Sequence, residues 1–571
     1  MDKYEALRQV FGHSAFRPGQ EALIDAVMQG RDALGIMPTG AGKSACFQIP
    51  ALTREGVTLV ISPLISLMKD QVAALKQAGV PAAYINSALT PGQCSLALQR
   101  AAEGQYKIIY VAPERLMTAG FRRFARLCPP ALIAVDEAHC VSHWGQDFRP
   151  SYLNIPQFID TLDKRPPLCA FTATATRQVR DDIIRLLRLN DPLVRVTGFD
   201  RPGLRFLLYK PKDKDEALLK LLRERRGASG IVYCATRKAV DEVCSLMRRC
   251  GYAAARYHAG MPDEERRDAQ DDFQFDRAQI MVATNAFGMG IDKSNVQFVI
   301  HYNMPRNLES YYQEAGRAGR DGAPADCILL YAKKDAALAH WMIDHGEENP
   351  ELTIEERERL KALELERLKQ MTFYASGTRC LRQSLLKYFG EADAPAYCGN
   401  CSVCLDMAAE AVGHEKQRAQ PAAAGPDEQR FAALRALRNM IAKASGVPAY
   451  VVFSDATLRE MARVMPKDED EFLSVSGVGG HKLKQYGAVF LDFIAKLDDM
   501  LGQRTSWDTA AFTQLVQASY IVDAPWSSGE LSKLKAQAAM GLPLESMARA
   551  LDRTRESVQS KLTELGLKAS F

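Results

Sequence analysis

The chain has 571 residues, of which 47% are hydrophobic and 25% charged, and its formal net charge is +4. This length and ordinary composition predict a soluble protein of several domains and exclude a disordered or fibrous one. No apolar run is long enough to cross a membrane and the first residues lack a signal-peptide pattern, so we expect a cytoplasmic protein without membrane contacts, whose polyanionic partners would be held by local patches.

Two blocks with an alternating pattern predict the main fold. In residues 32–209, short runs rich in β-branched residues alternate with longer helical patterns, and residues 230–332 repeat this alternation. Such alternation indicates a parallel sheet with helices on both faces. We therefore expect an α/β fold of two tandem parallel-sheet lobes. The strand candidates are 58–62, 108–111, 132–135, 231–234, 280–284 and 296–302.

A glycine-rich segment in the first block predicts a nucleotide site. A strand candidate at 33–37 runs into Pro38-Thr39-Gly40-Ala41-Gly42-Lys43-Ser44, and a helical pattern follows. The backbone N–H groups of Thr39, Gly40 and Gly42 could surround phosphate oxygens, helped by the positive end of the helix. Lys43 would neutralise phosphate charge, and the Ser44 hydroxyl would bind Mg²⁺. Alone, the segment could also be an ordinary turn.

An acidic pair strengthens the nucleotide interpretation. Asp136 and Glu137 directly follow the apolar run 132–135 and begin the sequence Asp-Glu-Ala-His. A carboxylate at the end of a strand is where Asp136 would hold Mg²⁺, and Glu137 is placed to orient or deprotonate the attacking water. A solvated acidic turn is the alternative, which the preceding glycine-rich segment disfavours.

The second block contains a pair of arginines. Arg317 and Arg320 lie three residues apart and would share one face if their segment were helical. The rigid guanidinium fork suits a phosphate whose charge rises in the transition state. We expect Gln313, Arg317 and Arg320 to complete the ATP site from the second lobe, although the arginines could instead be surface charges.

The order of these motifs resembles superfamily 2 helicases, and the details resemble the RecQ family. The matching segments are Leu7, Phe11-Gly12, 16–20, 62–64, 70–71, 112–115, 171–175 and 283–292. The resemblance implies RecA-like lobes and a role for Arg17 and Gln20 at the adenine base. It also implies an ATP-dependent DNA helicase that moves 3′ to 5′ on single-stranded and forked DNA. Its expected setting is DNA repair, recombination and replication in a bacterial cytoplasm, as a monomer that meets a single-stranded-DNA-binding protein.

An aromatic-rich loop, residues 140–150, follows the acidic pair. Aromatic rings in such a loop can stack on single-stranded bases, and each stack contributes about 1–3 kcal/mol. The loop is similar to the one that couples DNA binding to hydrolysis in the RecQ family, which implicates Trp144, Phe148 and Arg149. The alternative is that Trp144 and Phe148 fill the core beneath the loop.

Four of the 13 cysteines form a cluster: Cys380, Cys398, Cys401 and Cys404. The other nine are scattered among apolar segments, as is typical of reduced thiols. Two chained Cys-x-x-Cys pairs with one distant partner permit tetrahedral ligation of a structural Zn²⁺, and an iron–sulfur cluster is the alternative. The spacing is similar to that of the RecQ zinc module.

The sequence after the cysteines departs from many RecQ proteins. Those proteins carry a winged-helix domain at this point, with a β-hairpin that splits duplex DNA. Here only about 20 residues, rich in alanine, separate Cys404 from the next helical pattern. We therefore expect a form of the family that lacks the winged helix.

Two helical blocks complete the chain. Residues 426–502 resemble an HRDC domain, in which a Gly-Val-Gly segment could offer backbone amides to phosphate. We expect Tyr450 and Lys482 to contact DNA there, although Tyr450 could equally be a packing residue. Residues 523–571 predict three short helices, the first opened by Pro525, that fit either a helix-turn-helix or a small protein-docking bundle.

These observations predict a domain plan and leave two rival functions. An RNA helicase would share the acidic motif, but the cysteine set and the HRDC-like block argue against it. A strand-annealing protein that uses ATP only as a switch is supported by the missing winged helix. The expected domains are lobe 1 (1–198), lobe 2 (199–335), a helical zinc module (336–410), a linker (411–425), the HRDC-like domain (426–502) and the tail (523–571).

Overall fold

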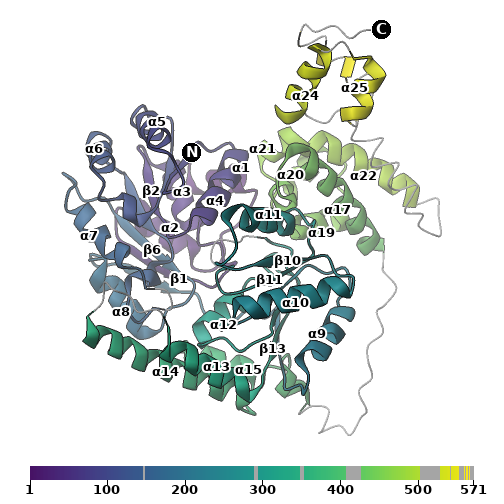
Figure 1. Ribbon diagram of the computed structural model, residues 1–571. Coiled ribbons are helices and arrows are strands. Elements are labelled where there is room, and N and C mark those ends of the chain that lie inside the picture. The colour runs from purple at the N-terminus through teal and green to yellow at the C-terminus, as the bar shows by residue number, and fades with distance from the viewer. Residues whose placement is uncertain are drawn as a thin grey trace. The chain divides into compact units, whose positions relative to one another are not determined.

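The computed structural model gives the fold of most of the chain (Figure 1). Contacts divide it into one unit of residues 1–7 and 15–419 and another of residues 8–14 and 420–571. Within the described residues, none of the helices has the length and apolar character needed to cross a membrane. The described residues are 1–145, 148–287, 293–346, 353–391, 393–406, 426–501, 528–539, 542–551, 558–559, 561–562 and 565.

Lobe 1 is built on a seven-stranded sheet with the strand order β3-β4-β2-β5-β6-β1-β7. All its strand pairs are parallel. Most of these strands are buried along their whole length, as expected where helices cover both faces of a sheet. The strands are β1 (Ala33–Ile36), β2 (Thr58–Ile61), β3 (Ala82–Ile85), β4 (Ile108–Val111), β5 (Leu132–Val135), β6 (Leu168–Thr172) and β7 (Leu193–Val196).

The α-helices of lobe 1 lie before and between its strands. The first two precede β1, and each of the others lies between two consecutive strands, where a parallel strand pair requires a crossover. They are α1 (Lys3–Phe11), α2 (Gln20–Met28), α3 (Ala45–Thr53), α4 (Ile65–Gln77), α5 (Pro91–Ala102), α6 (Ala119–Leu127), α7 (Asn154–Ile159) and α8 (Arg177–Leu186).

Lobe 2 repeats this architecture with a six-stranded parallel sheet in the order β10-β11-β9-β12-β13-β8. The prediction of two tandem parallel-sheet lobes is therefore confirmed. The strands are β8 (Leu204–Tyr209), β9 (Gly230–Tyr233), β10 (Ala254–Tyr257), β11 (Ile280–Ala283), β12 (Phe298–His301) and β13 (Ala325–Leu330). The helices are α9 (Lys214–Arg223), α10 (Arg237–Arg249), α11 (Asp263–Gln274), α12 (Leu308–Ala315) and α13 (Lys333–Asp344).

A helical segment, which we call the zinc module, follows lobe 2. It contains α14 (Ile354–Ser376), α15 (Leu381–Tyr388) and the cysteine loop 398–404. Met371 and Leu385 pack into the same core as Phe206 and Tyr311 of lobe 2. The cysteine loop also pairs with edge strand β8 through a bridge between Phe206 and Cys401. The zinc module and lobe 2 therefore share one core.

The HRDC-like domain has a core of its own. Phe453 lies at its centre, 4.9 Å from the ring centroid of Phe490 and 5.9 Å from that of Phe472. Its elements are α17 (Pro426–Ser445), α18 (Ala449–Val452), α19 (Asp455–Val464), α20 (Glu469–Ser474), α21 (Gly480–Lys482), a π-helical turn (Leu483–Gly487) and α22 (Ala488–Leu501).

The tail forms a separate small cluster. Helices α24 (Ser528–Ala539) and α25 (Leu544–Leu551) pack through Leu534 and Met547, and Val558 and Leu562 join the same core. The predicted start of the first tail helix, at Pro525, lies outside the described residues.

Candidate nucleotide site and zinc module

The glycine-rich segment forms a tight loop between β1 and α3. Gly40 and Gly42 have φ angles of +84° and +79°, in the left-handed region that residues with a side chain rarely adopt. Lys43 follows the second glycine, and its Nζ donates a hydrogen bond to the Met37 carbonyl, 3.2 Å away. Ser44 lies at the N-cap of α3. The loop thus brings Lys43 and Ser44 to the amino end of a helix, a common site for phosphate.

The predicted acidic pair lies at the carboxyl end of β5. Asp136 is buried, and the backbone N–H of Glu137 donates to its carboxylate at 3.0 Å. Burial and the charge of Glu137 raise the pKa of Asp136 to about 7, while the Lys43 ammonium opposes that shift. Glu137 itself has a φ of +46°, a strained conformation for a residue with a side chain. A buried carboxylate pair of this kind suits a divalent cation, whose charge would favour the ionised forms.

His139 connects the acidic pair to the next strand. Its Nδ1 atom lies 2.8 Å from the Thr172 hydroxyl, at the end of β6, and 3.4 Å from the carboxylate of Glu137. His139 therefore contacts both Glu137 and the Thr172 segment.

The arginine pair lies in a turn rather than on a helix, so the condition for a shared helix face is not met. Helix α12 ends at Ala315, and the following residues form a turn in which Gly319 has a φ of +59°. The C-cap of the helix, Gly316, has ordinary right-handed angles, and the left-handed Gly319 follows within the turn, where glycine adopts a positive φ freely. Gln313, the third predicted residue, lies half-buried on α12 itself.

The turn at residues 316–320, which we call the arginine turn, lies against the glycine-rich loop of lobe 1. A Cβ atom on Gly40 would be 3.8 Å from the Cα of Arg320, and one on Gly316 would be 3.5 Å from the Cβ of Thr39. Arg317 is buried beside Tyr233, and its Nε has no hydrogen-bond partner among the described residues. An unpaired buried donor at this position fits a phosphate oxygen.

Arg17 and Gln20 contact the glycine-rich loop. The Gln20 amide donates to the carbonyls of Ala41 and Gly42, at 3.1 and 2.9 Å, and the Arg17 guanidinium donates to the carbonyl of Gly40. Both residues therefore hold the loop, and their predicted role at adenine stays a prediction.

The four clustered cysteines come together as predicted for a metal site. Their sulfur atoms all lie within 4.8 Å of one another, and the pairs Cys398–Cys404 and Cys380–Cys401 are 4.0 Å apart. A tetrahedral Zn²⁺ with bonds of about 2.3 Å requires sulfur atoms about 3.8 Å apart. The sulfur geometry therefore fits one zinc ion and excludes disulfides.

Comparison with known proteins identifies four families along the chain. The matching models are DEAD/DEAH box helicase (residues 17–182), helicase conserved C-terminal domain (213–322), RecQ zinc-binding (333–405) and HRDC domain (427–494). The chain is 38% identical to the ATP-dependent DNA helicase RecQ of Bacillus subtilis, over 86% of this chain and 97% of that protein. It is 35% identical to the protein of the same name from Pasteurella multocida, over 87% and 94%.

The chain belongs to the RecQ family of ATP-dependent DNA helicases. The zinc-binding match, with the cysteine geometry, supports Zn²⁺ rather than an iron–sulfur cluster.

The aromatic loop of this RecQ protein is packed against its surroundings. Trp144 is half-buried on the core of lobe 1, and the Arg359 guanidinium of α14 lies 5.2 Å from its ring. Phe148 stacks on His143 at a centroid distance of 3.8 Å, and Arg149 donates to the Pro63 carbonyl at 2.9 Å. Trp144 therefore contacts the core, as the alternative interpretation held, and base stacking stays a prediction.

The two residues expected to contact DNA in the HRDC-like domain are both half-buried. Tyr450 lies on α18. The Lys482 ammonium lies 5.4 Å from the ring centroid of Phe453, and burial lowers its pKa to about 8. Lys482 thus points towards the domain core in this structure, which argues against an open phosphate contact.

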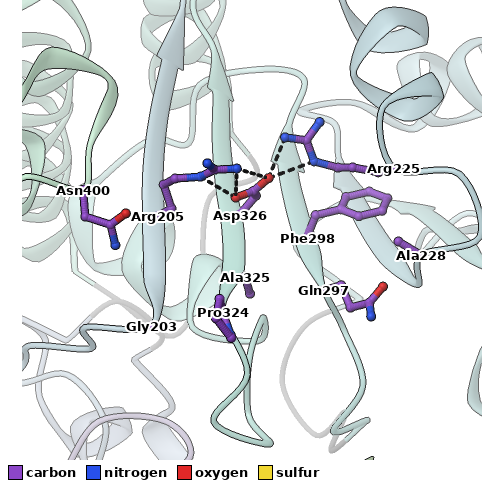
Figure 2. A pocket seen from close by; sticks show the side chains of 10 residues that line it. All are labelled: Gly203, Arg205, Arg225, Ala228, Gln297, Phe298, Pro324, Ala325, Asp326 and Asn400. Atoms are coloured by element: carbon purple, nitrogen blue, oxygen red, sulfur yellow. Dashed lines mark hydrogen bonds and ion pairs between the residues drawn. The ribbon is translucent and has the colours of Figure 1, made fainter. Parts of the chain in front are cut away.

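A cavity of about 420 Å³ lies at the amino ends of β8, β12 and β13 (Figure 2). Arg205 and Arg225 converge there on Asp326, with contacts of 2.8 Å or less. Burial opposes ionisation, but these arginines hold the pKa of Asp326 below its usual value. Because the arginines already have a carboxylate partner, we assign this cavity a structural role.

One residue of the site was missed by the sequence analysis. Arg201, between the two lobes, donates to three carbonyls of the arginine turn. A single arginine in an irregular segment has no periodicity or motif that would reveal such a contact.

Proposed function

We propose that this RecQ protein hydrolyses ATP with Mg²⁺ to move 3′ to 5′ along single-stranded DNA and to separate duplex strands at forks. The observation that carries the proposal is the contact between the arginine turn of lobe 2 and the glycine-rich loop of lobe 1. A nucleotide on that loop would touch both lobes, so hydrolysis would change how they meet. Membership of the RecQ family supports DNA as the substrate.

On lobe 1, the glycine-rich loop would hold the phosphates of ATP. The backbone N–H groups of Thr39, Gly40 and Gly42 would surround the phosphate oxygens, and Lys43 would neutralise their charge. Ser44 would bind the Mg²⁺ ion directly. Arg17 and Gln20, which hold this loop, would contact adenine.

The acidic pair and the arginine turn would carry out hydrolysis. Asp136 would hold Mg²⁺, which when bound neutralises phosphate charge, and Glu137 would orient the attacking water and accept its proton. Gln313, Arg317 and Arg320 would act from lobe 2, the two arginines on the charge that develops on the transferred phosphoryl group. Support comes from the burial of Arg317 with an Nε that lacks a partner among the described residues.

DNA would be sensed by the aromatic loop. For stacking on bases, Trp144 would have to leave its contacts with the lobe 1 core and Arg359, and Phe148 and Arg149 would move with it. Tyr450 would add a DNA contact in the HRDC-like domain, and Lys482 would do so only after leaving its contact with the Phe453 ring. The resemblance of the whole chain to the RecQ family further predicts that zinc has a structural role and that the protein is a monomer. It also predicts a single-stranded-DNA-binding protein as partner and a role in DNA repair and recombination.

ATP hydrolysis measured with and without single-stranded oligo-dT tests this proposal. We expect DNA to stimulate hydrolysis, Lys43→Ala to abolish it, and Glu137→Gln to retain ATP binding without hydrolysis. Lys76→Ala, which removes an exposed lysine from α4, is the matched control and should behave like the wild type.

The same proteins separate the rival functions. Hydrolysis stimulated by RNA but not by DNA would identify an RNA helicase. Strand annealing that persists in Lys43→Ala, without any ATP-driven unwinding by the wild type, would identify an annealing protein that uses ATP as a switch. Either result would contradict the proposal.

A further inference from the structure

The segment that joins the lobes, residues 197–203 between β7 and β8, is held by the zinc module. The ring of Phe389 stacks on that of Phe199 at 4.6 Å, with an interplanar angle of 17°. The carboxylate of Glu391 accepts a hydrogen bond from the backbone N–H of Phe199. Asn400, in the cysteine loop, donates to the Pro202 carbonyl at 3.3 Å. The end of α15 and the cysteine loop thus both hold one short linker.

Arg382 of α15 makes the strongest of these attachments. Its buried guanidinium donates to the Arg201 carbonyl at 2.8 Å, to the Leu204 carbonyl and to the carboxylate of Asp200. A buried guanidinium requires partners for its donors, and here the linker backbone provides them. The conformation of the linker is therefore set by Arg382 as well as by the two lobes.

Helix α15 also packs on both lobes at once. Leu386 and Phe389 belong to the core of lobe 1, whereas Leu381 and Leu385 belong to the core of lobe 2. The zinc module consequently contacts each lobe and the segment between them, which is where any relative movement of the lobes must be accommodated.

The linker in turn holds the arginine turn. Nη1 of Arg201 donates to the Gly316 carbonyl at 2.6 Å, and Nη2 donates to the carbonyls of Ala318 and Gly319 at 3.1 and 2.7 Å. These carbonyls follow the end of α12, where the helix leaves acceptors without intrahelical partners and a cation is favourable. Because the turn contains two glycines, it needs such an external contact to keep one conformation.

We propose that Arg201 is a positioning residue for ATP hydrolysis and that the zinc module acts on the reaction by holding the linker that carries Arg201. This inference rests on the proposed function, because it requires Arg317 and Arg320 to act on the phosphates. Arg382 contacts the linker, Arg201 of the linker contacts the arginine turn, and the arginine turn contacts the glycine-rich loop. A shift of about 1 Å along this series would reduce the rate by about 100-fold.

A direct role for Arg201 at the phosphates is less compatible with its contacts. A Cβ atom on Gly40 would lie 3.9 Å from Nη2 of Arg201, so the guanidinium is near the nucleotide site. Both of its Nη atoms, however, already donate to the arginine turn. Binding a phosphate would require breaking those hydrogen bonds, so the geometry assigns Arg201 to positioning.

The test compares Arg201→Met and Arg201→Lys in the full chain. For Arg201→Met we expect the kcat of DNA-stimulated ATP hydrolysis to fall by about 10- to 100-fold, with the Kd for a fluorescent ATP analogue within about 2-fold of the wild type. Arg201→Lys should recover only part of the loss, because an ammonium cannot reproduce the guanidinium fork. The matched control is Arg205→Met, whose guanidinium pairs with Asp326 (Figure 2) and should leave kcat unchanged.

A double-mutant cycle with Arg320→Ala separates failure of the inference from failure of the proposed function. If Arg201 acts through the arginine turn, Arg201→Met should add little to the loss caused by Arg320→Ala. An unchanged kcat in Arg320→Ala would reject the proposed function. If kcat falls in Arg320→Ala, the inference alone would be rejected by either of two results. One is wild-type kcat in Arg201→Met, and the other is fully additive losses in the double variant.

The zinc module is tested with Arg382→Met and Glu391→Ala, with bound zinc and the melting temperature measured alongside kcat. Glu391→Ala removes the oxygen that accepts from the Phe199 N–H, which a glutamine would retain. We expect both variants to retain one zinc ion per chain and to lose kcat at an unchanged Kd for the ATP analogue, Arg382→Met more than Glu391→Ala. Should Arg382→Met fail to fold, Glu391→Ala still decides the question. A folded, zinc-loaded Glu391→Ala protein with wild-type kcat would overturn the role of the module.

Discussion

The zinc module and the HRDC-like domain are both small and mainly helical, but their buried arginines have different partners. Arg382 of the zinc module binds the linker between the two lobes. Arg438 of the HRDC-like domain binds Asp455 of the same domain at 2.5 Å and the Phe453 carbonyl at 3.0 Å. The zinc module is thus tied to the linker between the lobes, whereas the buried arginine of the HRDC-like domain is paired within that domain.

The apolar contacts follow the same division. The zinc module shares cores with both lobes, while the core of the HRDC-like domain, from Phe431 to Leu497, is made of its own residues. We therefore expect damage to the zinc module to reach the ATP site, and damage to the HRDC-like domain to stay within it.

The largest expected effect comes from loss of zinc. Cys401→Ser removes a buried ligand beside the Phe206 bridge, and structural Zn²⁺ can contribute about 10–16 kcal/mol to folding in zinc-finger peptides. We expect metal analysis to show loss of the bound metal and calorimetry to show a lower melting temperature of the two lobes. A hydrolysis assay should show loss of ATP hydrolysis. A zinc-free protein that still hydrolyses ATP at the wild-type rate would show that the ATP site does not depend on the zinc module.

The second effect concerns the buried ion pair of the HRDC-like domain. Arg438→Met leaves the Asp455 carboxylate buried without its partner, which costs about 3–5 kcal/mol. We expect the unfolding free energy of the isolated domain, residues 426–501, to fall by that amount, while kcat for ATP hydrolysis by the full chain is unchanged. Lys443→Met, on the exposed side of α17, is the control. A matching loss of kcat would mean that the domain is not independent.

A smaller effect is expected at Lys482. Its pKa in the folded domain is about 8, below the ordinary value of 10.5, so folding disfavours its charged form. This destabilisation is complete below pH 8 and disappears as the pH rises towards 10.5, because the unfolded chain then binds more protons than the folded one. Lys482→Met should therefore stabilise the domain by about 1–2 kcal/mol at pH 7.

The control for that measurement is Lys484→Met, which removes an exposed lysine two residues along the chain. Denaturant unfolding should show a much larger difference between wild type and Lys482→Met at pH 7 than at pH 10. An equal difference at both values would show that charge burial is not the cause.

The smallest effect is expected from removal of residues 426–571. Because the described contacts of lobes 1 and 2 with the zinc module are complete without these residues, kcat for ATP hydrolysis should stay within about 2-fold of the wild type, equivalent to about 0.4 kcal/mol. DNA affinity, measured by fluorescence anisotropy, should fall more than kcat. A large loss of kcat would contradict the division between the two modules.

The sequence predicted the strands well where they are buried on both faces. The runs 108–111 and 132–135 coincide with β4 and β5 because such strands are continuous apolar runs. At the edge of the pattern, 296–302 was too long, since β12 covers only Phe298–His301. The cysteine cluster was equally predictable, because ligand spacing is local in the sequence.

Long-range contacts could not be predicted in this way. Whether the arginine pair lies on a helix or in a turn stayed open, because the sequence alone does not show that Gly319 adopts a positive φ. The contacts of Arg201 with the turn join residues more than 110 positions apart, and those of Arg382 with the linker about 180. Such contacts depend on how the lobes pack, and neither periodicity nor spacing records them.

The most direct test of the central claim is strand separation of matched duplexes that carry a 3′ DNA tail, a 5′ DNA tail or an RNA tail, with Mg²⁺ and ATP and with Lys43→Ala as control. We expect that only the 3′-tailed DNA is separated, and only by a protein that retains Lys43. DNA-stimulated hydrolysis without separation of any duplex would contradict it, because the protein would then be a translocase or an annealing factor.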